Sequence, residues 1–132
     1  GGKKMELNEF TQKVEEVLIR HKSILDIMTK LQETDARTTR AVAKAVTECG
    51  CISIKASKQQ LSTEVDYSEL DKFTSNHIDG ELCPRCKEQL VHEIGDHIFY
   101  ISALCNTLNL SPGDILSKKH DEITTLGKFS LF

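Results

Sequence analysis

The sequence predicts an all-α fold, in the form of a bundle of about four to five helices. Apolar residues recur at spacings of three and four along most of the chain, which is the pattern of helices with one apolar face. Both prolines, Pro84 and Pro112, stand where a helix would begin, because proline suits the first helical turn. Long helices joined in this way favour a bundle, and no segment requires a β-sheet.

The first third of the chain predicts one long helix and the start of another. No Pro or Gly interrupts the segment from Leu7 to Leu31. Its apolar face consists of Leu7, Phe10, Val14, Val17, Leu18, Ile24, Leu25, Met28 and Leu31. Asp35 is placed to cap a second helix. The sequence leaves two alternatives for the end of that helix: the residues after Gly50 either continue it or begin extended structure.

The middle of the chain predicts a polar connector over residues 57–65. Asp66 and Glu69 have the spacing of a capping box, so a short helix is expected from Asp66 to about Asn76. Asp79 and Gly80 then predict a turn.

The last part of the chain predicts two further helices. One begins at Pro84, and its apolar face consists of Leu90, Ile94, Ile98, Ile101, Cys105 and Leu108. Ser111, as a cap, and Pro112, at the first helical position, mark the start of another helix that reaches about Ile123.

Composition limits the class of protein. The 132 residues predict one domain over residues 5–132, and we expect Gly1–Lys4 to be a cloning remnant. A net charge of −3 and few aromatic residues argue against nucleic-acid binding. No apolar run approaches the roughly 20 residues of a membrane span, and no secretory signal follows Met5. We therefore expect a cytoplasmic protein without membrane contact.

Four of the five cysteines form two close pairs, Cys49 with Cys51 and Cys83 with Cys86. Four thiolates suffice for a tetrahedral zinc site, provided that the helix breaks near Gly50 so that the first pair can converge. Two alternatives remain open: buried free thiols, and a redox Cys-x-x-Cys pair. Cys105 stands on an apolar helix face and is expected in the core.

Two acids lie one turn apart on the helix that begins at Pro84. Glu93 and Asp96 share one helix face, roughly opposite the apolar face, and an acid pair of this kind can hold Mg²⁺ together with a substrate phosphate. The alternative is a solvated face without a ligand.

The segment Glu93-Ile-Gly-Asp96 and the residues around it, from Glu88 to about Asp121, resemble the MazG-like all-α nucleoside triphosphate pyrophosphohydrolases. Residues 40–51 resemble a degraded copy of that family's other metal motif, Glu-Glu-x-x-Glu. In this alignment Glu48 matches the second glutamate, whereas Thr47 and Cys51 replace the first and the third.

The resemblance implies a helical bundle, assembled as a dimer or tetramer, that hydrolyses a nucleoside triphosphate to a monophosphate and pyrophosphate. It implies a catalytic Mg²⁺ site on Glu48, Glu93 and Asp96. It also implies nucleotide contacts at Asn106, Lys118 and Lys119.

Two functions follow as hypotheses. In the first, the chain is a divergent MazG-like domain that binds or hydrolyses a nucleotide, with the acids holding magnesium. In the second, the chain is a non-catalytic module in which zinc on Cys49, Cys51, Cys83 and Cys86 joins two helices, for nucleotide sensing or partner binding. A third hypothesis is a helical protein that interacts with other proteins and binds neither a metal nor a nucleotide.

Overall fold

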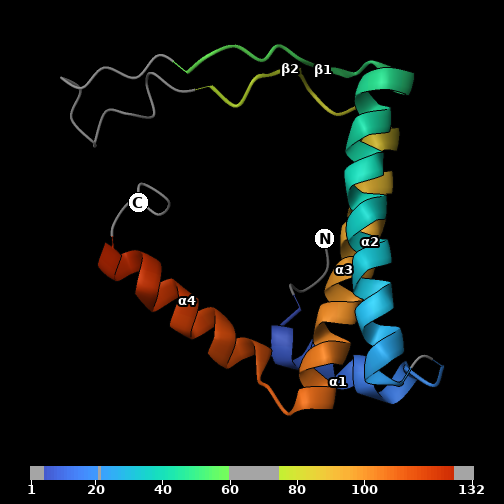
Figure 1. Cartoon of the computed structure of the whole chain (residues 1–132), viewed down its shortest axis with the longest axis vertical. Coiled ribbons are helices and arrows are strands. Elements are labelled where there is room, and N and C mark those ends of the chain that lie inside the picture. The colour runs from blue at the N-terminus through green and yellow to red at the C-terminus, as the bar shows by residue number, and fades with distance from the viewer. Residues whose placement is uncertain (1–4, 21, 60–74, 127–132) are drawn as a thin grey trace. The chain divides into compact units, whose positions relative to one another are not determined.

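A computed structural model describes residues 5–20, 22–59 and 75–126 of the chain (Figure 1). The described residues are predominantly helical, with four α-helices and one small two-stranded sheet. They belong to two compact units, one drawn from residues 1–36 and 93–132 and the other from residues 37–92. The prediction of a mostly helical chain is confirmed. A single domain over residues 5–132 stays a prediction.

Four helices contribute to the first unit. They are α1 (Leu7–Val17), the beginning of α2 (Ile24–Lys44), the later part of α3 (Pro84–Leu108) and α4 (Pro112–Leu126). Within the described part of the chain, no helix is both long and apolar enough to cross a membrane.

The core of the first unit joins three of these helices. Val14 of α1, Ile27 of α2 and Ala103 of α3 are at most 1% exposed and pack together. Partly buried apolar side chains surround them, namely Phe10, Leu18, Leu31, Phe99 and Leu104. Burial of such side chains is the main favourable contribution to folding, at about 1.5–3 kcal/mol for each fully buried Val or Ile.

The prediction of one helix from Leu7 to Leu31 is wrong, because the chain leaves the helix after Val17 and re-enters it at Ile24. Ser23 starts the second helix: its Oγ accepts a hydrogen bond from the N–H of Leu25 at 3.2 Å. Its carbonyl accepts one from the N–H of Ile27 at 2.9 Å. The break lets Val14 and Ile27 meet in one core. Asp35 is not a helix cap, since it lies inside α2.

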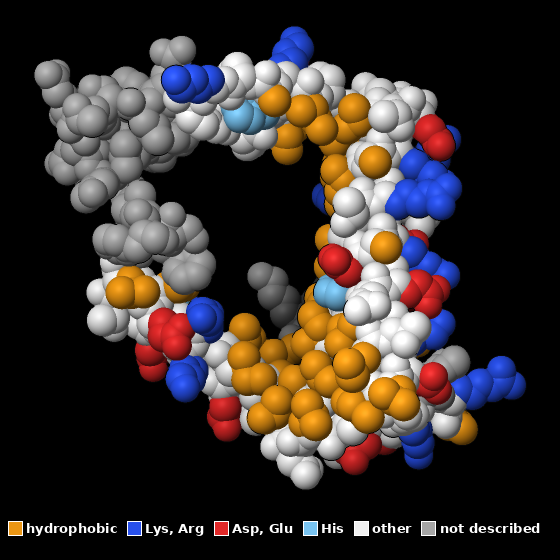
Figure 2. Space-filling view, viewed as in Figure 1, with side chains coloured by type: hydrophobic (Ala, Val, Ile, Leu, Met, Phe, Trp, Pro, Cys, Tyr) orange, Lys and Arg blue, Asp and Glu red, His pale blue; other side chains and the backbone are white. Residues whose placement is uncertain are grey.

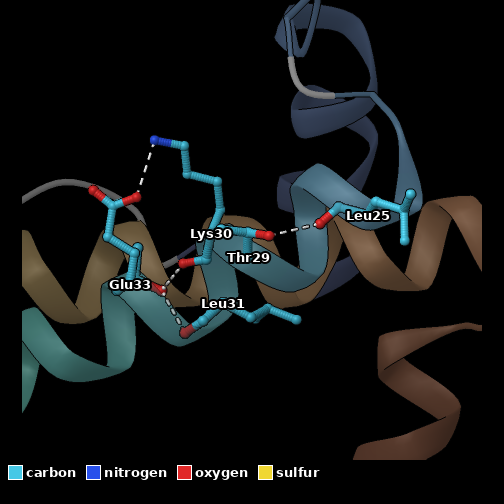
Figure 3. A network of polar contacts seen from close by, with 6 residues as sticks. Leu25, Thr29, Lys30, Leu31 and Glu33 are labelled. Atoms are coloured by element: carbon cyan, nitrogen blue, oxygen red, sulfur yellow. Dashed lines mark hydrogen bonds and ion pairs between the residues drawn. The ribbon is translucent and has the colours of Figure 1, made fainter.

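Threonine hydroxyls support the polar stretch of α2 (Figure 3). The hydroxyl of Thr29 donates to the carbonyl of Leu25 at 2.9 Å, and the hydroxyl of Thr34 donates to the carbonyl of Lys30 at 2.9 Å. Lys30 and Glu33 form an ion pair at 3.1 Å. These local contacts satisfy the two threonine hydroxyls and one pair of opposite charges within the helix.

A tight corner joins α3 to α4, as the sequence predicts. Asn109 has a φ of 56°, and the N–H of Leu110 donates to the carbonyl of Cys105 at 2.9 Å. This is a left-handed helix end of the Schellman type. The next helix starts at Pro112, where the N–H of Gly113 donates to Oδ1 of Asn8 in α1 at 3.2 Å. The predicted starts of α3 and α4 are therefore confirmed.

The second unit contains the two-stranded sheet, which the sequence does not predict. Strand β1 (Ile52–Ile54) pairs antiparallel with β2 (Ile78–Gly80), the green and yellow segments in Figure 1. The expected turn at Asp79 and Gly80 is wrong, because both residues belong to β2. The expected short helix from Asp66 falls mostly on residues 60–74, which lie outside the described residues.

Burial along helix α3 does not simply follow its apolar pattern. Glu93, Ser102 and Ala103 are at most 8% exposed. The apolar residues Ile94, Ile98 and Ile101 are 39–41% exposed, although Cys105 of the same apolar stripe is 4% exposed. Figure 2 shows apolar side chains gathered on the visible face of the first unit. The acid-bearing face of α3 is therefore not simply a solvated face.

Candidate metal centre

The four paired cysteines converge in the second unit. Their sulfur atoms all lie within 4.8 Å of one another. Cys49 ends the turn that follows α2, and Cys51 directly precedes β1. Cys83 directly precedes α3, and Cys86 lies in its first turn. The prediction that these four thiols come together is confirmed, and their arrangement could bind a metal ion such as zinc.

The end of α2 is shaped so that Cys49 and Cys51 can face the same point. Helix α2 continues into a π-helical turn, η1 (Ala45–Cys49), and the N–H of Gly50 donates to the carbonyl of Ala45 at 2.9 Å. Gly50 then takes a φ of 78°, a left-handed conformation that glycine adopts without strain. The helix therefore breaks at Gly50, and Cys51 leads into β1.

Strand β2 approaches this break closely at Gly80. A Cβ atom placed on Gly80 would lie 2.6 Å from the carbonyl oxygen of Cys51, and Gly80 also has a φ of 93°. Any side chain at position 80 would therefore push the backbone at Cys51 away. Gly80 thus fixes the position of one prospective ligand, a role that the sequence does not predict.

The distance between two of the sulfurs matches that expected in a tetrahedral zinc site. The Sγ atoms of Cys49 and Cys83 lie 3.7 Å apart. Zinc–sulfur bonds of about 2.3 Å in a regular tetrahedron separate two sulfurs by about 3.8 Å. The N–H of Cys86 points to Sγ of Cys83 at 3.4 Å, an orientation that favours a thiolate at Cys83.

The two thiols at the start of α3, Cys83 and Cys86, have pKa values that are shifted in opposite directions. The N–H of Cys86 and, next, the Cys86 side chain lower the pKa of Cys83 to about 7. The hydrogen bond to the Cys83 side chain and burial raise the pKa of Cys86 to about 12. A cation stands beside the cluster: a hydrogen bond to Cys49, followed by the charges of the thiolates, raises the pKa of Arg85.

Cys105 is separate from the cluster, as predicted. It is 4% exposed on α3, and burial raises the pKa of its thiol. Its environment is that of a core residue.

The predicted magnesium ligands are divided between the two units. Glu93 is 8% exposed and Asp96 is partly buried, and both stand on α3 in the first unit. Glu48 belongs to the second unit, where it is exposed beside Cys49. A shared magnesium site on these three acids stays a prediction.

Near Asp96, the side chain of His97 has a partner of its own. Its Nδ1 lies 2.8 Å from the hydroxyl oxygen of Thr34, which is 3% exposed. This contact ties α2 to α3 within the first unit, and the sequence offered no signal for it.

The three residues predicted to contact a nucleotide occupy different surroundings. The amide Nδ2 of Asn106 donates to the carbonyl of Thr11 at 2.9 Å. Asn106 also lines a cavity of about 220 Å³, with Glu15, Lys22 and Thr107 among its neighbours. On α4, Lys118 is exposed, and Lys119 pairs with Glu122 at 2.6 Å.

Comparison with protein families, with curated proteins and with solved structures found no match to this chain.

Proposed function

We propose that the chain is a zinc-binding helical protein whose metal ion joins the end of α2 to the start of α3. The observation that carries this proposal is the convergence of Cys49, Cys51, Cys83 and Cys86 within 4.8 Å. Four protein ligands complete a tetrahedral coordination shell and leave no position for substrate, which is the pattern of a structural zinc site.

The donor set favours zinc over magnesium. Thiolates are soft ligands that select zinc, whereas magnesium prefers carboxylate and water oxygens. Four thiolates around Zn²⁺ carry a net charge of −2, and the Arg85 guanidinium beside Cys49 offsets part of that charge. The site therefore supplies its own charge compensation.

Cobalt substitution tests this proposal directly. Co²⁺ added to the metal-free chain is expected to give the absorption bands of a tetrahedral thiolate complex, and zinc is expected to displace it. Cys83→Ser should weaken these bands, while the matched control Cys105→Ser should leave them unchanged. Octahedral cobalt spectra in the unaltered chain would refute the site.

A second candidate function is favoured by one observation on α3. Glu93 is 92% buried and Asp96, one turn later, is partly buried, so these acids are not a fully solvated pair. Buried or partly buried carboxylates one turn apart suit a divalent cation. This observation favours, as a second proposal, a divergent MazG-like domain that binds or hydrolyses a nucleotide at Glu93 and Asp96.

A pyrophosphate-release assay with Mg²⁺ over a set of nucleoside triphosphates tests the second candidate. Asp96→Asn should abolish any activity found, because it removes a prospective metal ligand. Asp114→Asn is a matched control, since Asp114 is exposed in the first turn of α4. Hydrolysis that survives Asp96→Asn would refute the assignment of the site.

The exposed apolar face of α3 supports the further proposal of a homo-oligomer. Ile94, Ile98 and Ile101 follow the alternating spacing of four and three that joins helices in coiled coils.

A further inference from the structure

We propose that the cysteine cluster is also a peroxide-responsive switch, in which oxidation joins Cys49 and Cys83 by a disulfide and expels the metal ion. This inference rests on the zinc site proposed above. It adds to that site the control of metal binding by oxidation, which a purely structural zinc site does not need.

The positions of the two sulfurs favour this particular pair. The Sγ atoms of Cys49 and Cys83 lie 3.7 Å apart. A disulfide bond is about 2.05 Å long, so the sulfurs must approach each other by roughly 1.7 Å. Rotation of the side chains can supply a movement of this size once the metal ion no longer holds the sulfurs apart.

Exposure makes the cluster accessible to a small oxidant. Cys49 and Cys83 are partly exposed to solvent, whereas Cys105 is buried and only 4% exposed. Oxidation of cysteine follows thiolate character and solvent access, and metal coordination keeps the cluster in the thiolate form. Cys105 therefore serves as an internal reference that should react last.

The reaction balances with hydrogen peroxide as the oxidant. One thiolate of the pair attacks a peroxide oxygen and breaks the O–O bond, which gives a sulfenic acid and hydroxide. The other thiolate then attacks the sulfenic sulfur and expels a second hydroxide. In total, two thiolates lose two electrons, one peroxide gains them, and two protons complete two water molecules.

The oxidised site can no longer hold zinc firmly. Only the thiolates of Cys51 and Cys86 remain, and a structural zinc site requires four protein ligands. The disulfide nevertheless links the same two segments that the metal linked, because Cys49 ends η1 and Cys83 precedes α3. A dithiol reductant should reverse the reaction by thiol–disulfide exchange.

The test treats the zinc-loaded full chain with hydrogen peroxide. Released zinc is measured with a chromogenic chelator, and disulfides are mapped by mass spectrometry of a non-reduced digest. We expect one Cys49–Cys83 disulfide for each zinc ion released, and recovery of zinc binding after reduction. Cys105→Ser should behave like the unaltered chain.

Other results overturn the inference. Zinc released with a Cys83–Cys86 disulfide, or with sulfinic acids in place of disulfides, would show that the proposed pair does not form. Zinc retained with all thiols intact would show that the site does not respond to peroxide. A chain that binds no zinc would overturn the proposed function as well, so the two failures are distinguishable.

Discussion

The sulfur atoms of Cys49 and Cys83 lie 3.7 Å apart, although 34 positions separate the two residues in the sequence. Residues far apart in the chain meet at a cost in conformational entropy, and something must hold them there. Few buried apolar side chains are available near the cluster: Ala45 and Ile52 are the buried apolar residues described in the second unit. A bound metal ion is therefore the principal stabilising contact in our account.

Removal of the metal should lower the stability of the chain. A ligand that binds only the folded state stabilises it by about 4 kcal/mol when its free concentration is 1,000 times its dissociation constant. We therefore expect a strong chelator to lower the melting temperature, as followed by circular dichroism. Cys83→Ser should already melt at the lower temperature, and the chelator should change it little. Equal melting of the unaltered chain with and without chelator would contradict this prediction.

Gly80→Ala should weaken metal binding by about ten-fold or more, in the range seen when the support of a metal ligand is lost. The added Cβ would meet the carbonyl oxygen of Cys51 at 2.6 Å, so Cys51 must move. Gly50→Ala is the matched control, because it also occupies a left-handed conformation but its Cβ meets no atom within 4 Å. It should strain the backbone while retaining more of the affinity. Isothermal titration with zinc measures both, and equal losses would argue against a specific role of Gly80.

In the metal-free chain, Cys83 should react with iodoacetamide before Cys86. The thiolate is the nucleophile, and the pKa of Cys83 is lowered to about 7 whereas that of Cys86 is raised to about 12. The Cys83 rate should therefore rise as the pH increases through about 7, while Cys86 stays protonated. Mass spectrometry of peptides after brief alkylation measures both rates. Faster labelling of Cys86 at neutral pH would contradict the described hydrogen bonds.

Ile27→Ala should destabilise the first unit by about 2–5 kcal/mol, because Ile27 is fully buried and the substitution leaves a cavity. Leu25→Ala on the same helix is the control. Leu25 is 70% exposed, so its loss should change stability by less than about 0.5 kcal/mol. Urea denaturation gives both values. Similar values for the two variants would mean that the described core is wrong.

Ile98→Asp should reduce self-association if the exposed face of α3 joins copies of the chain. Ile98 is 39% exposed and stands in the middle of the apolar stripe, where a charge would lose hydration in an interface. Light scattering at several concentrations measures the mass. An unaltered chain that is monomeric throughout would refute the proposed oligomer.

The cysteine cluster could be predicted from the sequence because it depends on few conditions. Two close pairs of thiols indicate a single metal ion bound by all four, and the glycine between Cys49 and Cys51 indicates the helix break that this requires. The starts of α3 and α4 were equally readable, since Pro84 and Pro112 carry strong local signals.

Features that depend on tertiary contacts, such as burial and strand pairing, could not be predicted in the same way. The periodicity of α3 reveals an apolar stripe, but it does not say which positions of that stripe are buried: Cys105 is 4% exposed, whereas Ile94, Ile98 and Ile101 are 39–41% exposed. The segment from Leu7 to Leu31 has helical spacing throughout, and this spacing outweighs the single capping residue Ser23, where the second helix starts. The strands are three residues each, too short for an alternating pattern, and their pairing depends on the close approach of Gly80 to Cys51.

The metal content of the purified chain tests the central claim most directly. Elemental analysis should be made on protein purified without added metal or chelator, beside Cys83→Ser and the control Cys105→Ser. Our account predicts about one zinc ion per chain in the unaltered protein and in Cys105→Ser, and a clear loss in Cys83→Ser. Absence of zinc from all three proteins, or equal zinc in all three, would contradict it.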